Sequence, residues 1–441
     1  MPSSPPAGPL LTDLYEITMA AGYWARGLQD RATFSVFVRN HERKRNFFVA
    51  AGLESLLQEL EAYHFQNEDI DYLRHQNLFA PQFLEALAEC RFTGDVDALP
   101  EGTLFFAEEP VLEITAPLIQ AQLIETLVLN TIGVATLIAS KALRCIHAAA
   151  GRPLVDFALR RTQGADAGDQ VARSTYLAGF SATSNVRAGK RFGIPLTGTM
   201  AHAFVSAFPS EREAFRAYAE TFPGSTIFLI DTYDTLAGAR NAAAVAQEMR
   251  QRGAAPLGVR LDSGDMIALS REVRHILDGA GLQDMNIYAS SSFDEYKIDD
   301  CVRAAAPIDA FGVGTRVGVS ADMPYLDIVY KLVHVGRRDI RKLSPGKVSL
   351  AGRKQVFRRT DAAGIYREDL LGCRDEAIPD AQPLLKPVMA DGSRTAPPEQ
   401  LADVRRRVAR QFSRLDPRYK SIRRHAAYPV RVSEALLARQ T

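Results

Sequence analysis

Short apolar runs alternate with longer amphipathic segments from residue 152 onward, and this alternation restricts the possible folds more than any other feature. The runs cover residues 154–159, 194–198, 226–230, 256–261, 286–289, 308–311 and 326–333. Segments of helical length, such as 235–252 and 265–280, separate most of them. Strands that alternate with helices predict βαβ units and a parallel sheet. Seven such runs in about 180 residues favour a barrel over an open sheet.

Polar residues and glycines follow these runs at the points where the predicted strands end. They are Arg160, Arg161, Thr199, His202, Asp231, Asp234, Arg260, Asp262, Ser290, Ser291, Ser292, Gly312, Gly314 and Arg316. In a parallel β/α barrel, the carboxyl ends of the strands form the rim of the active site. The sequence therefore predicts a site for anionic ligands with a divalent metal ion.

The rest of the chain has a less regular pattern. Its 441 residues suit two domains, or one large barrel with an attached layer. Residues 11–150 mix helical spacing, as at 53–60, with strand-like patterns, as at 33–38. Residues 340–370 are typical of a small β unit, and 400–424 of a basic amphipathic helix. We expect both to pack on the N-terminal domain.

Charge, cysteine spacing and apolar segments argue against several classes of protein. Lys+Arg total 53 and Asp+Glu 52, and this net charge of +1 argues against a dedicated nucleic-acid binder. The four cysteines form no C-x-x-C pair, which argues against structural zinc or a disulfide framework. The first ten residues lack the pattern of a signal peptide. Glu125 and Asn130 interrupt the most apolar stretch, at 123–140, so we expect a buried helix and no membrane span. Together with the scattered cysteines, which we expect to be reduced, this favours a cytoplasmic protein.

The candidate catalytic residues each have a structural and a functional interpretation. A histidine on its own is usually structural, but His202 follows a strand end, where it could transfer a proton or attack phosphorus. Asp231 and Asp262 could cap helices, or they could contact ribose hydroxyls and Mg²⁺. Arg260 could meet a phosphate.

A glycine pair ends a late strand at Gly312 and Gly314. On its own a G-x-G is usually a turn. At the sixth strand of a barrel, however, its backbone amides could hold a phosphate. The sequence has no Walker A motif, because Gly189-Lys190 is followed by Arg191.

Nine segments, in order along the chain, resemble the motifs of the nicotinate phosphoribosyltransferase family. They are the sequences at 11–19 (LTDLYEITM), 157–164 (FALRRTQG), 184–189, 198–202 (GTMAH), 229–234, 259–265, 311–315, 342–347 and 352–355. The resemblance extends over about residues 10–435, which makes it more specific than any single motif.

The resemblance implies an α/β fold with two parts. An N-terminal α/β sandwich domain, residues 10–150 joined by the C-terminal segment 335–435, accompanies an incomplete, irregular parallel β/α barrel of the type II phosphoribosyltransferase kind. The barrel would be the catalytic domain, residues 151–334. The family implies a homodimer with shared active sites, in which Tyr15 reaches the site of the neighbouring subunit.

The resemblance also implies an ATP-dependent, ligase-type reaction in NAD biosynthesis. Nicotinate and phosphoribosyl pyrophosphate would give nicotinate mononucleotide and pyrophosphate, with Mg²⁺ as cofactor and ATP as co-substrate. ATP hydrolysis would be coupled through a phosphohistidine at His202. Zinc is not expected, because the cysteine-rich element of some relatives is missing.

The resemblance assigns roles to particular side chains. Phe157 and Arg160 would border the pyridine ring, and Asp231, Arg260 and Asp262 would serve the ribose, the phosphates and Mg²⁺. The expected catalytic residues are His202, Asp231 and Asp262. The expected substrate-binding residues are Tyr15, Phe157, Arg160, Thr199, Arg260, Ser291, Gly312, Gly314 and Thr315.

Three alternatives remain. Nicotinamide phosphoribosyltransferases resemble this chain, but they place an aspartate near the position of Asn185, and its absence favours the acid substrate. Quinolinate phosphoribosyltransferases are usually shorter. A non-catalytic sensor with the same fold would not need the intact set His202, Asp231, Arg260 and Asp262.

Overall fold

The computed structural model describes residues 8–39, 44–344 and 349–440, which form two compact units. The first unit contains residues up to 140 and from 325 onward, and the second contains residues 141–324. The domain limits expected from the sequence, 150/151 and 334/335, stay a prediction. Part of the motif at 342–347, from 345 onward, lies outside the described residues, as do the first seven residues of the chain.

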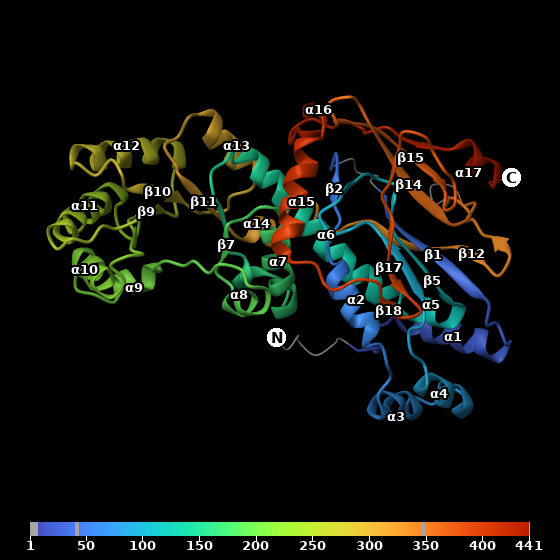
Figure 1. The fold of residues 1–441 in the computed structure, drawn as a ribbon. Helices are drawn as coiled ribbons and strands as arrows, with labels where there is room; N and C mark the ends of the chain where they lie inside the picture. The colour runs from blue at the N-terminus through green and yellow to red at the C-terminus, as the bar shows by residue number, and fades with distance from the viewer. Residues whose placement is uncertain (1–7, 40–43, 345–348, 441) are drawn as a thin grey trace. The chain divides into compact units, whose positions relative to one another are not determined.

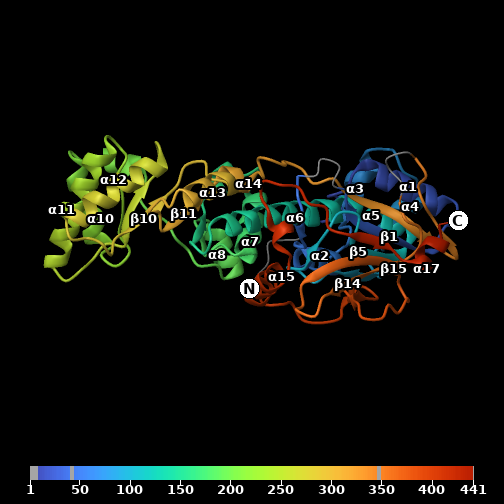
Figure 2. The same ribbon diagram turned by 90° about the horizontal axis from the view of Figure 1, so that it is seen from above.

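The first unit is built on a seven-stranded antiparallel sheet. Its strand order is β13 (Arg338–Asp339), β12 (Ile328–Val335), β1 (Arg31–Val38), β5 (Pro110–Pro117), β3 (Asp95–Ala98), β17 (Lys386–Ala390) and β18 (Ser393–Arg394). Strand β1 lies inside the sheet, between β12 and β5, and is almost fully buried. Figure 2 shows α5 (Leu118–Leu123) close to β1 and β5.

Two smaller sheets and further helices complete this unit. The four-stranded sheet has the order β16 (Gln382–Pro383), β14 (Lys354–Thr360), β15 (Tyr366–Cys373) and β19 (Val430–Val432), and β2 (Phe48–Val49) pairs with β4 (Leu104–Phe105). The helices are α1 (Leu14–Ala25), α2 (Leu53–Glu61), α3 (Asn67–His75), α4 (Pro81–Ala88), α15 (Leu401–Ser413), α16 (Pro417–Lys420) and α17 (Glu434–Ala438).

Helix α6 (Glu125–Ala148) contains the most apolar part of the chain. By length and composition alone it could cross a membrane, but 72% of its most apolar window is buried inside the protein. The buried helix expected at 123–140 is therefore present, and it has the burial of a core helix.

The second unit contains a six-stranded parallel sheet. Its order is β7 (Ala182–Thr183), β6 (Leu154–Asp156), β11 (Ala310–Val313), β10 (Asn286–Ala289), β9 (Gly258–Leu261) and β8 (Ile227–Leu229). Among the described residues, no strand pairs with the outer side of β8, and the outer side of β7 has only a single bridge, from Thr183 to Leu196, so the barrel does not close. The predicted fold class, with an incomplete parallel barrel, is confirmed.

Helices separate these strands, as the alternating pattern predicts. They are η1 (Leu159–Arg161), α7 (Ala165–Ala178), α8 (Val186–Phe192), α9 (His202–Ser206), α10 (Glu211–Thr221), α11 (Thr235–Gln251), α12 (Met266–Gly279), α13 (Glu295–Arg303) and α14 (Thr315–Gly318). Figure 1 shows α11 and α12 beside β9 and β10. Gly238 of α11 lies so close to β8 that an added Cβ would be 2.0 Å from the Ile230 carbonyl oxygen, so a larger residue would displace the helix.

Two of the seven predicted barrel strands are wrong. The run at 326–333 belongs to β12, which pairs antiparallel with β1 in the first unit. The run at 194–198 forms a single bridge between Leu196 and Thr183. Pro195 has no backbone N–H to donate, which limits pairing there. The short strand β7 was not predicted, because two residues are too few to produce a periodic pattern.

Candidate active site

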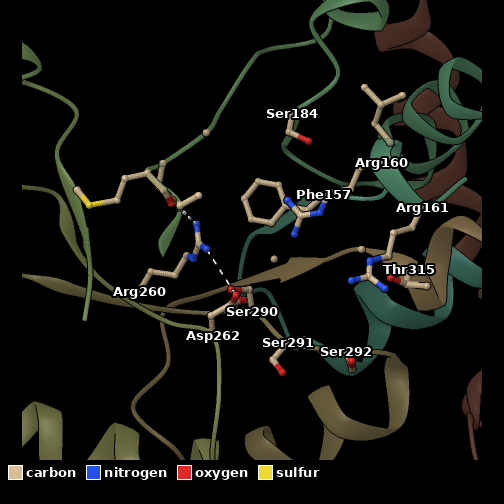
Figure 3. Close-up of a pocket in the computed structure, with 17 residues that line it drawn as sticks. Phe157, Arg160, Arg161, Ser184, Arg260, Asp262, Ser290, Ser291, Ser292 and Thr315 are labelled. Carbon is tan, nitrogen blue, oxygen red and sulfur yellow. Dashed lines mark hydrogen bonds and ion pairs between the residues drawn. The ribbon is translucent and has the colours of Figure 1, made fainter. Parts of the chain in front are cut away.

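A pocket of about 490 Å³ lies in the second unit at the carboxyl ends of the parallel strands (Figure 3). Nine of the residues predicted from the sequence line it: Phe157, Arg160, Thr199, Arg260, Asp262, Ser291, Gly312, Gly314 and Thr315. They come from loops far apart in the sequence. The parallel sheet brings them together because all its strands end on the same side.

Arg260 occupies one side of the pocket and holds the 198–201 loop. Its Nη1 donates to the Met200 carbonyl at 3.2 Å and to the Thr199 hydroxyl, and its Nη2 lies 3.7 Å from Asp262 Oδ2. The pKa of Arg260 is lowered, chiefly because the guanidinium is buried and also because the Arg160 cation is near. The Asp262 and Asp231 carboxylates act in the opposite direction and offset part of this effect. Two cations that approach each other in one cavity favour an anionic ligand.

Asp262 and Asp231 form a linked pair of carboxylates after strands β9 and β8. Asp231 Oδ2 accepts from the Asp262 backbone N–H at 3.1 Å and from the Ser263 hydroxyl. Asp262 Oδ1 accepts from the Ser290 hydroxyl at 2.5 Å. These donors fix the direction in which the other oxygen of each carboxylate points.

His202 begins helix α9 and lies beside this pair. Its Nδ1 is 3.2 Å from the Thr232 hydroxyl oxygen, and its Nε2 is 3.7 Å from Asp262 Oδ2. The side chain is 46% exposed. His202 does not line the pocket itself, but an accessible imidazole next to a pocket carboxylate can be reached by a ligand.

Phe157, Arg160 and Arg161 project toward the pocket from the segment after β6 (Figure 3). The buried Asp156 carboxylate holds this turn, because it accepts from the Ala158 backbone N–H at 2.8 Å and the Thr183 hydroxyl at 2.7 Å. A Cβ on Gly312 would lie 2.6 Å from the Phe157 ring. Glycine is therefore required at 312 for the ring to lie against β11. Sequence reasoning missed Asp156, which has no motif signal beyond its place at a strand end.

The loop after β10 provides three serines to the pocket, Ser290, Ser291 and Ser292. Only Ser291 was selected from the sequence as a binding residue. Ser290 is equally relevant, since its hydroxyl donates to Asp262. Its position directly after a strand placed it among the predicted rim residues, but no binding role was assigned to it.

The substrate argument drawn from Asn185 needs correction. This residue was expected to lie near the pyridine substituent, but its side chain is buried and already bonded. Its Oδ1 accepts from the Ala188 N–H at 3.0 Å, and its Nδ2 donates to the Gly168 carbonyl and to Asp169 Oδ1. The neighbouring Ser184 lines the pocket instead. Asn185 therefore gives no direct evidence about the substrate.

Tyr15 lies on α1 in the first unit, outside the residues that line this pocket. Its side chain is 46% exposed, and Leu14 and Met19 on the same helix are exposed as well. Burial of part of the ring and the Glu125 carboxylate raise the pKa of Tyr15.

One oxygen of the carboxylate pair could take a metal ion. Among the described residues, no donor bonds to the buried Asp231 Oδ1. No three His, Cys, Asp or Glu side chains gather into a metal-binding group anywhere in the described ranges. Mg²⁺ binds through one or two protein carboxylates together with water and substrate phosphates, and Asp231 Oδ1 is an oxygen of that kind.

Comparisons with known proteins give one consistent result. The family model "Nicotinate phosphoribosyltransferase (NAPRTase) family" matches residues 153–360, and the models of its N-terminal and C-terminal domains match 10–133 and 380–440. Nicotinate phosphoribosyltransferase pncB2 of Mycobacterium tuberculosis is 46% identical over 432 residues, which are 98% of this chain and 92% of that protein. Nicotinate phosphoribosyltransferase of Bacillus subtilis is 39% identical over an alignment of 456 positions, which covers 96% of this chain and 93% of that protein.

A solved structure extends the comparison to the fold. The crystal structure of human nicotinic acid phosphoribosyltransferase matches with a TM-score of 0.88 at 30% identity, covering 97% of this chain and 98% of that one.

Proposed function

The chain belongs to the nicotinate phosphoribosyltransferase family, and on this premise we propose how its pocket works. The substrates are nicotinate and phosphoribosyl pyrophosphate, and the products are nicotinate mononucleotide and pyrophosphate. The observation that carries the proposal is the composition of one pocket. Three arginines, the aromatic ring of Phe157 and the Asp262 carboxylate surround the same space.

The reaction needs opposite charges at two places. The pyridine nitrogen attacks ribose C1, a C–N bond forms, and the C1–oxygen bond breaks with its electron pair leaving on pyrophosphate. Positive charge develops on the ribose, and the Asp262 and Asp231 carboxylates stabilise it. Arg260 and the glycine-rich end of β11 hold the phosphates. No general base is required, because the pyridine nitrogen is already nucleophilic.

Mg²⁺ and ATP complete the proposed system. Asp231 and Asp262 would hold Mg²⁺ together with substrate phosphates, and the ion would supply charge neutralisation at the leaving group. A nitrogen of His202 attacks the γ-phosphorus of ATP, so that a P–N bond forms, ADP leaves, and water later releases phosphate. The protein is proposed to act in the cytoplasm.

A turnover assay tests this function. Nicotinate, nicotinamide and quinolinate are each supplied with phosphoribosyl pyrophosphate and Mg²⁺, with and without ATP. Product formation from nicotinate, stimulated by ATP, supports the proposal. Turnover of quinolinate or nicotinamide in preference to nicotinate contradicts it.

We expect kcat/KM for nicotinate to exceed that for nicotinamide by about tenfold or more. A guanidinium offers a carboxylate two charge-assisted hydrogen bonds, and mispairing costs roughly 1–3 kcal/mol. Arg160→Met is expected to remove most of this preference. Arg252→Met, at a side chain that is 67% exposed and paired with Glu220, is the control. Equal kcat/KM for acid and amide in the unmodified enzyme would refute the assignment.

We also propose a homodimer with shared active sites, because exposed apolar residues of α1 flank Tyr15. Tyr15→Ala and Asp262→Ala subunits are each expected to be nearly inactive. Mixing them after mild dissociation should restore up to about a quarter of the activity per site, since one subunit combination rebuilds an intact pair. A fully active monomer, measured by light scattering alongside turnover, would contradict the proposal.

A further inference from the structure

The serine loop after β10 has an unusual backbone. Ser291 has a φ of 109° and Ser292 a φ of 50°, and neither residue is a glycine. Residues with a Cβ rarely adopt such conformations, and they persist where surrounding contacts hold them. Both serines line the pocket. A contact that holds this loop therefore also shapes the pocket wall.

Lys297 makes such a contact. Its Nζ donates to the Ser291 carbonyl oxygen at 2.8 Å, and its ammonium group lies 4.6 Å from the centre of the Phe293 ring. The side chain is half-buried and lies outside the set of residues that line the pocket. Lys297 therefore holds the loop by the carbonyl group of Ser291, without lining the pocket itself.

The helix that carries Lys297 is itself anchored on two sides. Asp294 caps α13 by accepting from the Tyr296 and Lys297 backbone N–H groups, and its other oxygen accepts from Arg316 at 2.7 Å. The fully buried Glu295 accepts from Arg144 Nε at 2.9 Å and pairs with Lys141. These contacts fix the start of α13, and the Arg316–Asp294 pair also joins it to α14, the short helix after β11.

We propose that Lys297 is a positioning residue that holds Ser291 and Ser292 in place to bind a phosphate group of phosphoribosyl pyrophosphate. The inference rests on the function proposed above for this pocket. Without the lysine, the Ser291 carbonyl loses its donor and the two serines relax toward ordinary backbone angles. Their amides and hydroxyls then no longer converge on the phosphate, although the loop remains able to fold.

Kinetics separate this role from a direct contact between the ammonium and the phosphate. Lys297→Met is expected to raise KM for phosphoribosyl pyrophosphate by roughly tenfold, with KM for nicotinate changed less than about twofold. In the double variant Lys297→Met/Ser291→Gly, KM for phosphoribosyl pyrophosphate should be close to that of Ser291→Gly alone, because glycine adopts a φ of 109° without strain and no longer needs the lysine. Arg303→Met on the same helix, at a 70% exposed side chain paired with Asp299, is the matched control. Ser291→Gly alone measures the effect of removing the hydroxyl.

The outcomes are distinct. An unchanged KM for phosphoribosyl pyrophosphate in Lys297→Met overturns the proposal. A KM for phosphoribosyl pyrophosphate about tenfold higher in the double variant than in Ser291→Gly alone also overturns it, since the lysine would then act by an ionic contact that does not depend on the conformation of Ser291.

Hydrogen exchange in the ligand-free enzyme tests the structural part without relying on turnover. The amides of residues 291–293 should exchange faster in Lys297→Met and at the unmodified rate in Arg303→Met. Unchanged exchange in Lys297→Met overturns the positioning role whatever the enzyme's substrate is. If the unmodified enzyme does not convert nicotinate while exchange responds as expected, the function fails and the loop support stands.

Discussion

Replacing His202 by alanine is expected to abolish ATP hydrolysis and the stimulation of synthesis by ATP. The imidazole is the proposed acceptor of the γ-phosphoryl group, and alanine offers no nucleophile in its place. Its partners Thr232 and Asp262 remain in the variant, but a hydroxyl 3.2 Å and a carboxylate 3.7 Å from the ring cannot substitute for it. ATPase activity should therefore fall to background.

Slow synthesis without ATP is expected to survive in His202→Ala. Asp262, Asp231 and Arg260 still surround the reacting ribose and phosphates, so the stabilisation of the transition state is retained. Because His202 is 46% exposed, its loss should change the free energy of unfolding by no more than about 0.5 kcal/mol. Thermal denaturation checks this directly.

Labelling identifies the phosphoryl acceptor. The enzyme is incubated with ATP labelled in the γ-phosphate, then treated with acid or with alkali. A label that is lost in acid, kept in alkali and absent from His202→Ala supports the assignment. The same amount of label in His202→Ala would place the acceptor elsewhere. His275→Ala, at another histidine of the second unit, serves as the control and should keep the label.

Asp262→Asn is expected to lower kcat by about 10²–10³-fold, which corresponds to roughly 2.7–4 kcal/mol of transition-state stabilisation. The substitution keeps the shape and one oxygen acceptor for Ser290, but it removes the negative charge beside the ribose. Charge that develops only in the transition state affects kcat, so KM for nicotinate should change little.

Asp265→Asn is the matched control for this change. Asp265 is exposed three residues further along the chain, and it caps α12 by accepting from the Ile267 and Ala268 N–H groups at 3.0 and 3.1 Å. Asparagine caps helices about as well as aspartate, so this variant should keep its activity. Steady-state kinetics that show an equal loss in both variants would mean that the effect of Asp262 is structural.

Much of the candidate site could be predicted from local sequence. Arg260 and Asp262, for example, lie at the end of an apolar run of strand length, and the strand ends of parallel sheets converge. The order of motifs then identified the family from residues 10 to 435. Asp156 was missed, and Ser290 was noted only as a polar residue after a strand, because their importance comes from the partners they bond, Thr183 and Asp262, and not from a recognisable motif.

The sequence by itself determined the alternation of strands and helices, the family, and the side chains that lie at the strand ends. These features depend on periodicity and residue order, which are local. Only the tertiary structure decided that residues 326–333 pair with β1, nearly 300 residues away, since an apolar run can join any sheet that offers a free edge. Tertiary contacts also turned Asn185 into a buried cap and held Ser291 in a left-handed conformation through Lys297. Such choices depend on which partners lie nearby, and long-range packing determines that.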